Sequence, residues 1–151
     1  MVEIRKAKRE DTPFILEMIR GIAKYEQLLD QVEADLINLE KELFDEGNAF
    51  VIIAYKDKLP VAFALYFYNF STFKGKKGLY LEDLFVLPDY RKQGIGNQLF
   101  EYLVNEAKMK NCGRIEWVCL NWNSPAIDFY EKKNAVPMND WITFRLDELL
   151  F

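Results

Sequence analysis

The sequence predicts a single α/β domain with mixed connections (α+β), in which a mixed central β-sheet is flanked by about four helices. Strand-like and helix-like segments follow in the order strand, two helices, three strands, helix, strand, helix, strand. The strand at 79–87, the helix at 94–110 and the strand at 115–120 form a parallel crossover, a connection that is almost always right-handed. Half of the 151 residues are hydrophobic and 15% are aromatic, which is enough for one core spanning residues 1–151.

The N-terminal third predicts one strand followed by two helices. Val2–Lys6 alternates as a strand does. Asp11 or Thr12 can cap a helix, and a proline follows in its first turn, where its fixed φ is favourable. A second helix has leucines at helical spacing and ends near Gly47.

The middle of the chain predicts three strands. Residues 49–55 and 61–68 flank the polar turn Lys56-Asp57-Lys58, as the two strands of a hairpin do. Residues 69–78 are rich in turn residues and predict a loop. The strand at 79–87 follows, and the proline after it ends the strand because proline cannot continue a ladder.

The last third predicts a helix, a strand, a helix and a final strand. The helix at 94–110 has apolar residues spaced by four and is followed by a glycine suited to a C-terminal cap. A strand at 115–120 comes next. Asn123 or Ser124 then caps the fourth helix, and the chain closes with a strand at 141–146.

Two glycines, Gly94 and Gly96, join the strand at 79–87 to the helix that follows. A loop that enters a helix in this way points backbone N–H groups outward, and the helix dipole adds partial positive charge. Together they predict an anion site suited to a phosphate or pyrophosphate, with Arg91 and Lys92 adding charge beside it. A plain strand-to-helix turn is the alternative if the two glycines are taken alone.

Several common motifs are excluded. The third glycine of the dinucleotide fingerprint would fall on Leu99, and no Gly-Lys-Ser/Thr follows for a nucleoside-triphosphate loop. The chain has 0 histidines, which excludes Ser-His-Asp and Cys-His nucleophiles and any histidine metal site. Cys112 and Cys119 lack the spacing of metal ligands, so we expect no metal and two ordinary thiols in a reducing compartment.

Charge and hydropathy bear on the binding partners and on the cellular location. The net charge is -4, from 20 Lys and Arg against 24 Asp and Glu, and this balance argues against a nucleic-acid partner. No basic-plus-apolar leader opens the sequence, and no apolar run approaches the ~20 residues of a membrane span. We therefore predict a cytoplasmic protein with no membrane partner.

Several motifs together resemble the Gcn5-related N-acetyltransferase (GNAT) superfamily. Arg-x-x-Gly-x-Gly at 91–96 follows a strand with an acidic pair. Downstream, residues 121–130 read Asn-Trp-Asn-Ser-Pro-Ala-Ile-Asp-Phe-Tyr. In that superfamily Arg/Gln-x-x-Gly-x-Gly/Ala holds the pyrophosphate of acetyl-coenzyme A. Ala-Lys-Tyr-Glu at 23–26 and Tyr-Leu-Glu-Asp at 80–83 narrow the resemblance to the diamine (spermidine/spermine) N1-acetyltransferases. The matches run from about residue 3 to the C-terminus.

The resemblance implies acetyl-coenzyme A as cosubstrate and a homodimer whose acceptor site borrows residues from its neighbour. It assigns acceptor binding to Tyr25, Glu26, Glu82 and Asp83. It assigns cofactor binding to the backbone of the strand, the glycine loop, the helix start and one asparagine, which are Leu84, Phe85, Val86, Arg91, Lys92, Gln93, Gly94, Ile95, Gly96, Asn97 and Asn123. One of the strand N–H groups, that of Phe85, is the expected oxyanion donor.

Acetyl transfer to an amine requires removal of a proton, because an alkyl amine of pKa about 10.4 is neutral only at about one part in ~10³ at pH 7. By resemblance, Glu82 removes that proton, directly or through water, and the phenol of Tyr130 protonates the departing thiolate. Two alternatives stay open. Glu82 and Asp83, which should face opposite sides of the strand unless a bulge intervenes, can be acids whose polar groups are satisfied at the solvent end of the strand. Tyr130 can be a core tyrosine beside Phe129.

The loop Phe-Ser-Thr-Phe-Lys-Gly at 70–75 bears on the acceptor. Spermidine-type enzymes carry an aspartate there, whereas this run resembles the thialysine-acetylating branch. Lys74, Lys76 and Lys77 are expected near the acceptor mouth, where they would disfavour a polycation and accommodate a carboxylate. We therefore predict a small primary amine, thialysine- or lysine-like, with diamines and polyamines as weaker acceptors. The rival functions are a peptide or protein amine acetyltransferase and a non-catalytic acyl-coenzyme A sensor.

Overall fold

A computed structural model describes all 151 residues, which form two compact units, Met1–Val118 and Cys119–Phe151. The first unit contains a five-stranded sheet in the order β1-β2-β3-β4-β5. The first three pairings are antiparallel and the last is parallel, so the sheet is mixed as predicted. The strands are β1 (Val2–Lys6), β2 (Phe50–Lys56), β3 (Leu59–Ser71), β4 (Lys76–Val86) and β5 (Ile115–Glu116).

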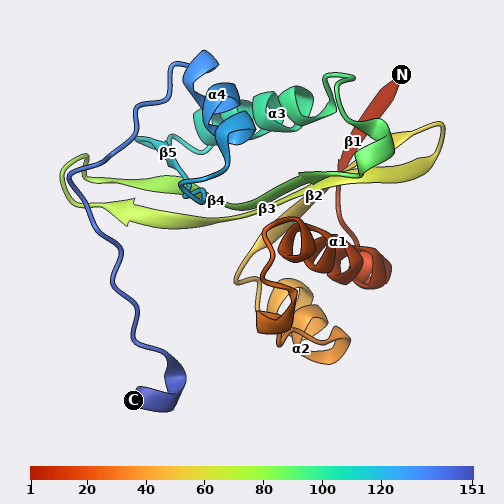
Figure 1. Cartoon of the computed structure of the whole chain (residues 1–151), viewed down its shortest axis with the longest axis horizontal. Coiled ribbons are helices and arrows are strands. Elements are labelled where there is room, and N and C mark those ends of the chain that lie inside the picture. Colours follow the sequence, from red (N-terminus) through yellow and green to blue (C-terminus); the bar gives the residue numbers. More distant parts are fainter. The chain divides into compact units, whose positions relative to one another are not determined.

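Helices cover both faces of this sheet, with α1 and α2 on one side and α3 on the other (Figure 1). They are α1 (Thr12–Tyr25), α2 (Leu36–Glu40) and α3 (Ile95–Met109), and a π-helical turn at Lys41–Asp45 continues α2. Asp35 caps α2, because its carboxylate accepts the Asn38 N–H at 2.8 Å. The α3 crossover between β4 and β5 confirms the predicted strand–helix–strand unit.

The core between α1 and the sheet is built from side chains that alternate along the strands. Gly21 allows close packing there, because a Cβ atom on it would lie 2.8 Å from Cε2 of Phe85. A larger residue at that position would push α1 away from β4. The buried members of this cluster are Ile15, Met18, Leu43, Val51, Ile53, Phe63, Leu65 and Phe85.

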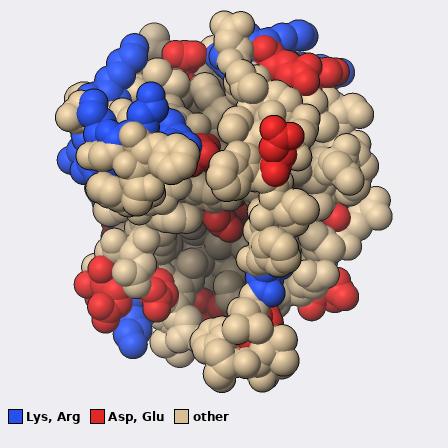
Figure 2. Space-filling model, turned by 90° about the vertical axis from the view of Figure 1, so that its left-hand side faces the viewer, with Lys and Arg blue, Asp and Glu red and all other residues tan.

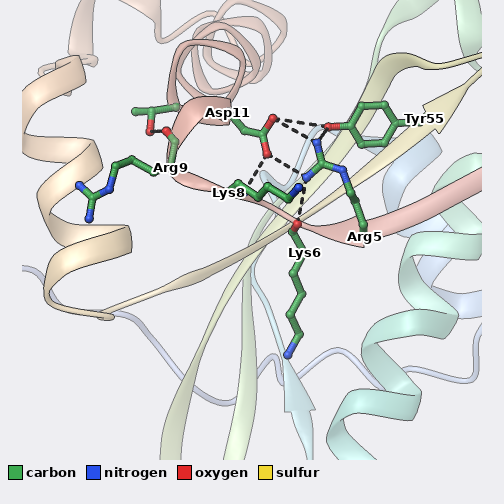
Figure 3. Close-up of polar contacts among 7 residues, drawn as sticks. Arg5, Lys6, Lys8, Arg9, Asp11 and Tyr55 are labelled. Carbon is green, nitrogen blue, oxygen red and sulfur yellow. Dashed lines mark hydrogen bonds and ion pairs between the residues drawn. The ribbon is translucent and has the colours of Figure 1, made fainter.

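A cluster around Arg5 fixes the start of α1 to the sheet (Figure 3). The Arg5 guanidinium donates to both oxygens of Asp11, at 3.0 and 3.3 Å, and also contacts the Tyr55 hydroxyl. The Lys8 backbone N–H donates to Asp11 at 2.7 Å. Burial pushes the pKa of Asp11 upward, but the hydrogen bonds from Arg5 and Lys8 outweigh it and lower the pKa below its usual 3.8.

The second unit contains α4 (Ser124–Lys132), which was predicted, and a short 3-10 turn at Glu148–Leu150. Pro125 lies in the first turn of α4. The strand predicted at 141–146 is wrong, because no residue of this unit forms a strand. Alternating apolar residues suit a strand, but a strand also needs a hydrogen-bonded neighbour, and nothing in the local sequence supplies one.

Two predicted boundaries also differ. The strand expected at 115–120 is limited to Ile115–Glu116. The loop expected at 69–78 is mostly strand, because β3 and β4 extend toward each other and leave only residues 72–75 as the turn. The end of the second helix near Gly47 is confirmed, since the π-helical turn that continues α2 ends at Asp45 with Glu46 as its C-cap.

Charges are unevenly distributed over the surface. Figure 2 shows the largest group of Lys and Arg side chains at the upper left of the displayed face, with others elsewhere on it, and Asp and Glu side chains in several places. The net charge of -4 therefore hides local fields of both signs. No helix of the protein is both long enough and apolar enough to cross a bilayer.

Candidate active site

A β-bulge sits in β4 at the predicted acidic pair. Leu65 of β3 is opposite Asp83, but the next residue, Tyr66, is opposite Leu81, so Glu82 has no partner across the ladder. A bulge breaks the alternation of side chains, which removes the expectation that Glu82 and Asp83 lie on opposite faces. Glu82 is exposed, whereas Asp83 is half-buried.

Three carboxyl groups interact at this bulge. Burial, followed by the negative charges of Glu82 and Glu26, raises the pKa of Asp83 to about 7. Glu26 caps the C-terminal end of α1, and burial raises its pKa as well. No Lys or Arg forms an ion pair with any of the three. We call these residues the acidic cluster; it concentrates negative charge that the protein itself does not neutralise.

The edge of β4 is open next to the acidic cluster. β5 pairs with β4 only at Leu79 and Tyr80, so the stretch Leu81–Val86 has no strand neighbour on that side. Backbone groups on such an edge can pair with an extended ligand as a further strand would. This is the arrangement expected for the pantetheine arm along Leu84, Phe85 and Val86.

A cavity of about 460 Å³ lies between α1 and the segment that follows β4. The Arg91 guanidinium is 5.4 Å from the ring centre of Tyr25 and 5.1 Å from that of Phe85. Its Nε also donates to the Val86 carbonyl oxygen at 2.9 Å. Arg91 therefore joins the end of α1 to the end of β4. The cavity is lined by Glu17, Gly21, Lys24, Tyr25, Phe85, Leu87, Pro88 and Arg91.

The backbone of the glycine loop is suited to binding an anion. Lys92 and Gly94 both have left-handed backbone conformations, with φ of 61° and 79°. Gly94 is the N-cap of α3 and has no side chain with which to cap the helix, and no atom beyond its chain neighbours would lie within 4 Å of a Cβ at Gly94. Gly96 lies against β4, since a Cβ there would be 3.7 Å from Cδ2 of Leu84. An uncapped helix start with open space beside it fits a pyrophosphate.

One contact of this loop was missed by the sequence analysis. The Lys56 ammonium contacts the side-chain oxygen of Gln93. The two residues are 37 positions apart in the chain, so no local motif could reveal the contact.

The loop used to predict the acceptor lies elsewhere in this chain. The Ser71 hydroxyl accepts the Lys74 N–H at 3.1 Å and also contacts the Arg114 guanidinium. Lys76 begins β4, seven residues before Asp83, which places the two ~20 Å apart along the strand. The expectation that Lys74 and its neighbours lie near the acceptor mouth is therefore wrong within one chain, because the hairpin is longer than predicted.

Asn123 and Tyr130 belong to the second unit. Asn123 is the N-cap of α4, and Tyr130 lies in the helix, with its ring 5.6 Å from that of Phe129. Seven residues span nearly two turns, so both residues lie toward one side of the helix. Their roles beside the acidic cluster and the glycine loop stay predictions.

Comparisons with known proteins point to one family. The sequence profile of the family described as "Acetyltransferase (GNAT) family" matches residues 10–135. A thialysine N-epsilon-acetyltransferase of Sus scrofa is 35% identical, covering 97% of this chain and 92% of that protein. A human spermidine/spermine N(1)-acetyltransferase-like protein 1 is 31% identical over 98% of this chain but only 23% of its own length.

Solved structures extend the agreement to the fold. A possible acetyltransferase from Clostridium difficile 630 superposes with a TM-score of 0.80 at 25% identity, covering 97% of each chain. The similarity in sequence and in backbone therefore spans nearly all of the chain.

Proposed function

Because this chain belongs to the GNAT family and is an acetyl-CoA-dependent N-acetyltransferase, we propose that its acceptor is a small primary amine of the thialysine or lysine type. The acidic cluster carries this proposal. Its three carboxyl groups have no cationic partner in the protein, and Asp83 is held where ionisation is costly. An ammonium group supplied by an acceptor would provide the missing positive charge.

The choice among amines rests on similarity. The thialysine N-epsilon-acetyltransferase of Sus scrofa matches over 97% of this chain, and the run at 70–75 resembles that branch. Lys74, Lys76 and Lys77 do not support the choice, since they lie at the far end of the β3–β4 hairpin. Diamines and polyamines stay in the proposal as weaker acceptors.

Proton removal is assigned to the acidic cluster. Glu82 is exposed at the bulge and can take a proton from an arriving ammonium, directly or through water. Asp83, with its pKa near 7, can bind the second charge of the acceptor or exchange the proton with Glu82. Tyr25 and Glu26, at the end of α1, complete the proposed acceptor site.

The cosubstrate is proposed to lie along the open edge of β4. Backbone groups of Leu84, Phe85 and Val86 would hold the pantetheine arm, and the Phe85 N–H would donate to the oxygen that gains negative charge during attack. Acetyl-coenzyme A supplies an activated acyl group, so the amine attacks directly and no enzyme nucleophile is needed. The residues Arg91, Lys92, Gln93, Gly94, Ile95, Gly96, Asn97 and Asn123 would hold the rest of the molecule.

Departure of the thiolate requires an acid, and Tyr130 is proposed for this role. A phenol can give a proton to a departing thiolate of similar basicity, so proton transfer between the two groups is nearly balanced. A homodimer is proposed on the resemblance to the diamine acetyltransferases, and the cytoplasmic location stays a prediction from the sequence.

The test is the release of free coenzyme A thiol from acetyl-CoA with a panel of amines: thialysine, lysine, spermidine, putrescine and a lysine-containing peptide. We expect the highest kcat/KM with thialysine, and reactions without amine serve as the control for hydrolysis. Faster acetylation of spermidine than of thialysine would overturn the ranking. Turnover of the peptide alone would overturn the small-amine proposal, and binding of acetyl-CoA without turnover of any amine would indicate a sensor.

A further inference from the structure

Lys56 lies where the β2–β3 hairpin meets the glycine loop. It is the last residue of β2, and the next two residues, Asp57 and Lys58, form the turn with φ of 51° and 66°. The Lys56 ammonium contacts the side-chain oxygen of Gln93, and the Gln93 side-chain nitrogen donates to the Asp89 carbonyl oxygen at 3.4 Å. Gln93 thus connects the hairpin to the loop, and the lysine is held beside the loop.

The charge of Lys56 is not neutralised by the protein. Asp57 follows Lys56 in the turn, Glu3 lies on the neighbouring strand β1, and Asp89 precedes the glycine loop, and none of these acids forms an ion pair with Lys56. Arg91 and Lys92 lie in the same loop, and α3 begins directly after it. Cations beside the N-terminus of a helix are unfavourable, because the helix dipole is positive there. Such a concentration of positive charge is stabilised when an anion binds.

We propose that Lys56 is a further phosphate-binding residue of the coenzyme A site, supplied by the β2–β3 hairpin rather than by the glycine motif. The proposal rests on the proposed function, which places the diphosphate of coenzyme A at the loop that starts α3. Lys56 exchanges the neutral oxygen of Gln93 for a phosphate oxygen when the ligand binds. A lysine is suited to this exchange, because its flexible stem carries a compact charge that needs no fixed geometry.

The experiment is isothermal titration of the full chain with coenzyme A and with 3′-dephospho-coenzyme A. The variants are Lys56→Met, which keeps the stem and removes the charge, and Lys58→Met as the matched control from the same hairpin. We expect Lys56→Met to raise the Kd of coenzyme A about 5- to 20-fold and to weaken its dependence on salt, as loss of one charge-assisted contact does. Lys58→Met should stay within twofold of the parent chain.

Either of two patterns supports the proposal. Equal losses for both ligands place Lys56 at the diphosphate, and a loss confined to coenzyme A places it at the 3′-phosphate. Parent-like Kd values for both ligands in a folded Lys56→Met protein, checked by its thermal unfolding, overturn the proposal. Failure of the parent chain to bind either ligand would instead overturn the proposed function.

Discussion

The two ends of α1 carry acids in opposite electrostatic surroundings. At the start of the helix, Asp11 is hydrogen-bonded by Arg5 and by the Lys8 N–H, and its pKa is lowered. At the end, Glu26 joins Asp83 and Glu82 without any cation, and the pKa of Asp83 rises to about 7. The first arrangement stabilises the fold, whereas the second costs stability, because like charges repel and a helix C-terminus disfavours an anion. A cluster of charges left unpaired is therefore the stronger sign of a binding site.

The largest difference between the two ends should appear in catalysis. We expect Asp83→Asn to lower kcat/KM for thialysine by at least ~10²-fold, because the acidic cluster loses a proton-binding group and part of its attraction for the ammonium. The same substitution should leave the thermal stability unchanged or higher, since it removes a repelled charge. Steady-state kinetics with thermal unfolding of the same sample measure both effects. Parent-like kinetics would remove Asp83 from the site.

Glu82→Gln is the companion to that variant. If Glu82 removes the proton from the acceptor, the kcat/KM of Glu82→Gln should fall at neutral pH to a similar extent as that of Asp83→Asn. An enzyme as active as the parent would exclude Glu82 as the base and leave the task to Asp83.

At the start of α1 the expected loss is in stability. Asp11→Asn should lower the free energy of unfolding by about 2 kcal/mol, because the Arg5 guanidinium loses its charged partner. Activity should stay within twofold of the parent. Urea denaturation is the measurement, and Glu3→Gln, an exposed acid of β1, is the matched control with an expected change below about 0.5 kcal/mol. A loss of activity at unchanged stability would contradict the division of roles between the two ends.

The contributions of the two ends of α1 to the free energy of unfolding should change with pH in opposite directions. The folded chain keeps the Asp83 proton up to about pH 7, whereas the unfolded chain releases it near pH 4, so the contribution of Asp83 to stability falls as the pH rises between these values. The lowered pKa of Asp11 makes its contribution fall as the pH drops below about 4. Relative to Asp83→Asn, the parent should lose about 2 kcal/mol from pH 4 to pH 8, allowing for partial exposure of the carboxyl. If the free energies of unfolding of the parent and of Asp83→Asn changed equally with pH, the raised pKa of Asp83 would be refuted.

The smallest effect concerns Tyr55. Its hydroxyl contacts Arg5 and donates to Asp11 at 3.5 Å, a long hydrogen bond. Tyr55→Phe should lower the free energy of unfolding by about 0.5–1 kcal/mol, with no change in kcat/KM. A double-mutant cycle with Asp11→Asn sharpens the result, because coupling is expected only if the hydroxyl acts through this cluster. Additive losses would show that Tyr55 contributes through the packing of its ring.

Features that depend on neighbouring residues could be predicted from the sequence. The strand before the glycine loop, the start of α3 near Gly94 and the proline in the first turn of α4 follow from local steric preferences. The bulge at Glu82 could not be predicted, because it depends on how β4 pairs with β3. The Lys56–Gln93 contact joins distant segments, and the failed strand at 141–146 shows that alternation alone supplies no hydrogen-bonding partner.

The open edge of β4 has a consequence for handling the protein. An unpaired strand edge rich in apolar residues, such as Leu81–Val86, is a template on which another chain can add by backbone pairing. Ligand lying along the edge removes that template. Purified enzyme stored without coenzyme A should therefore lose monodispersity sooner than enzyme stored with it, because the bound ligand would block association along this edge.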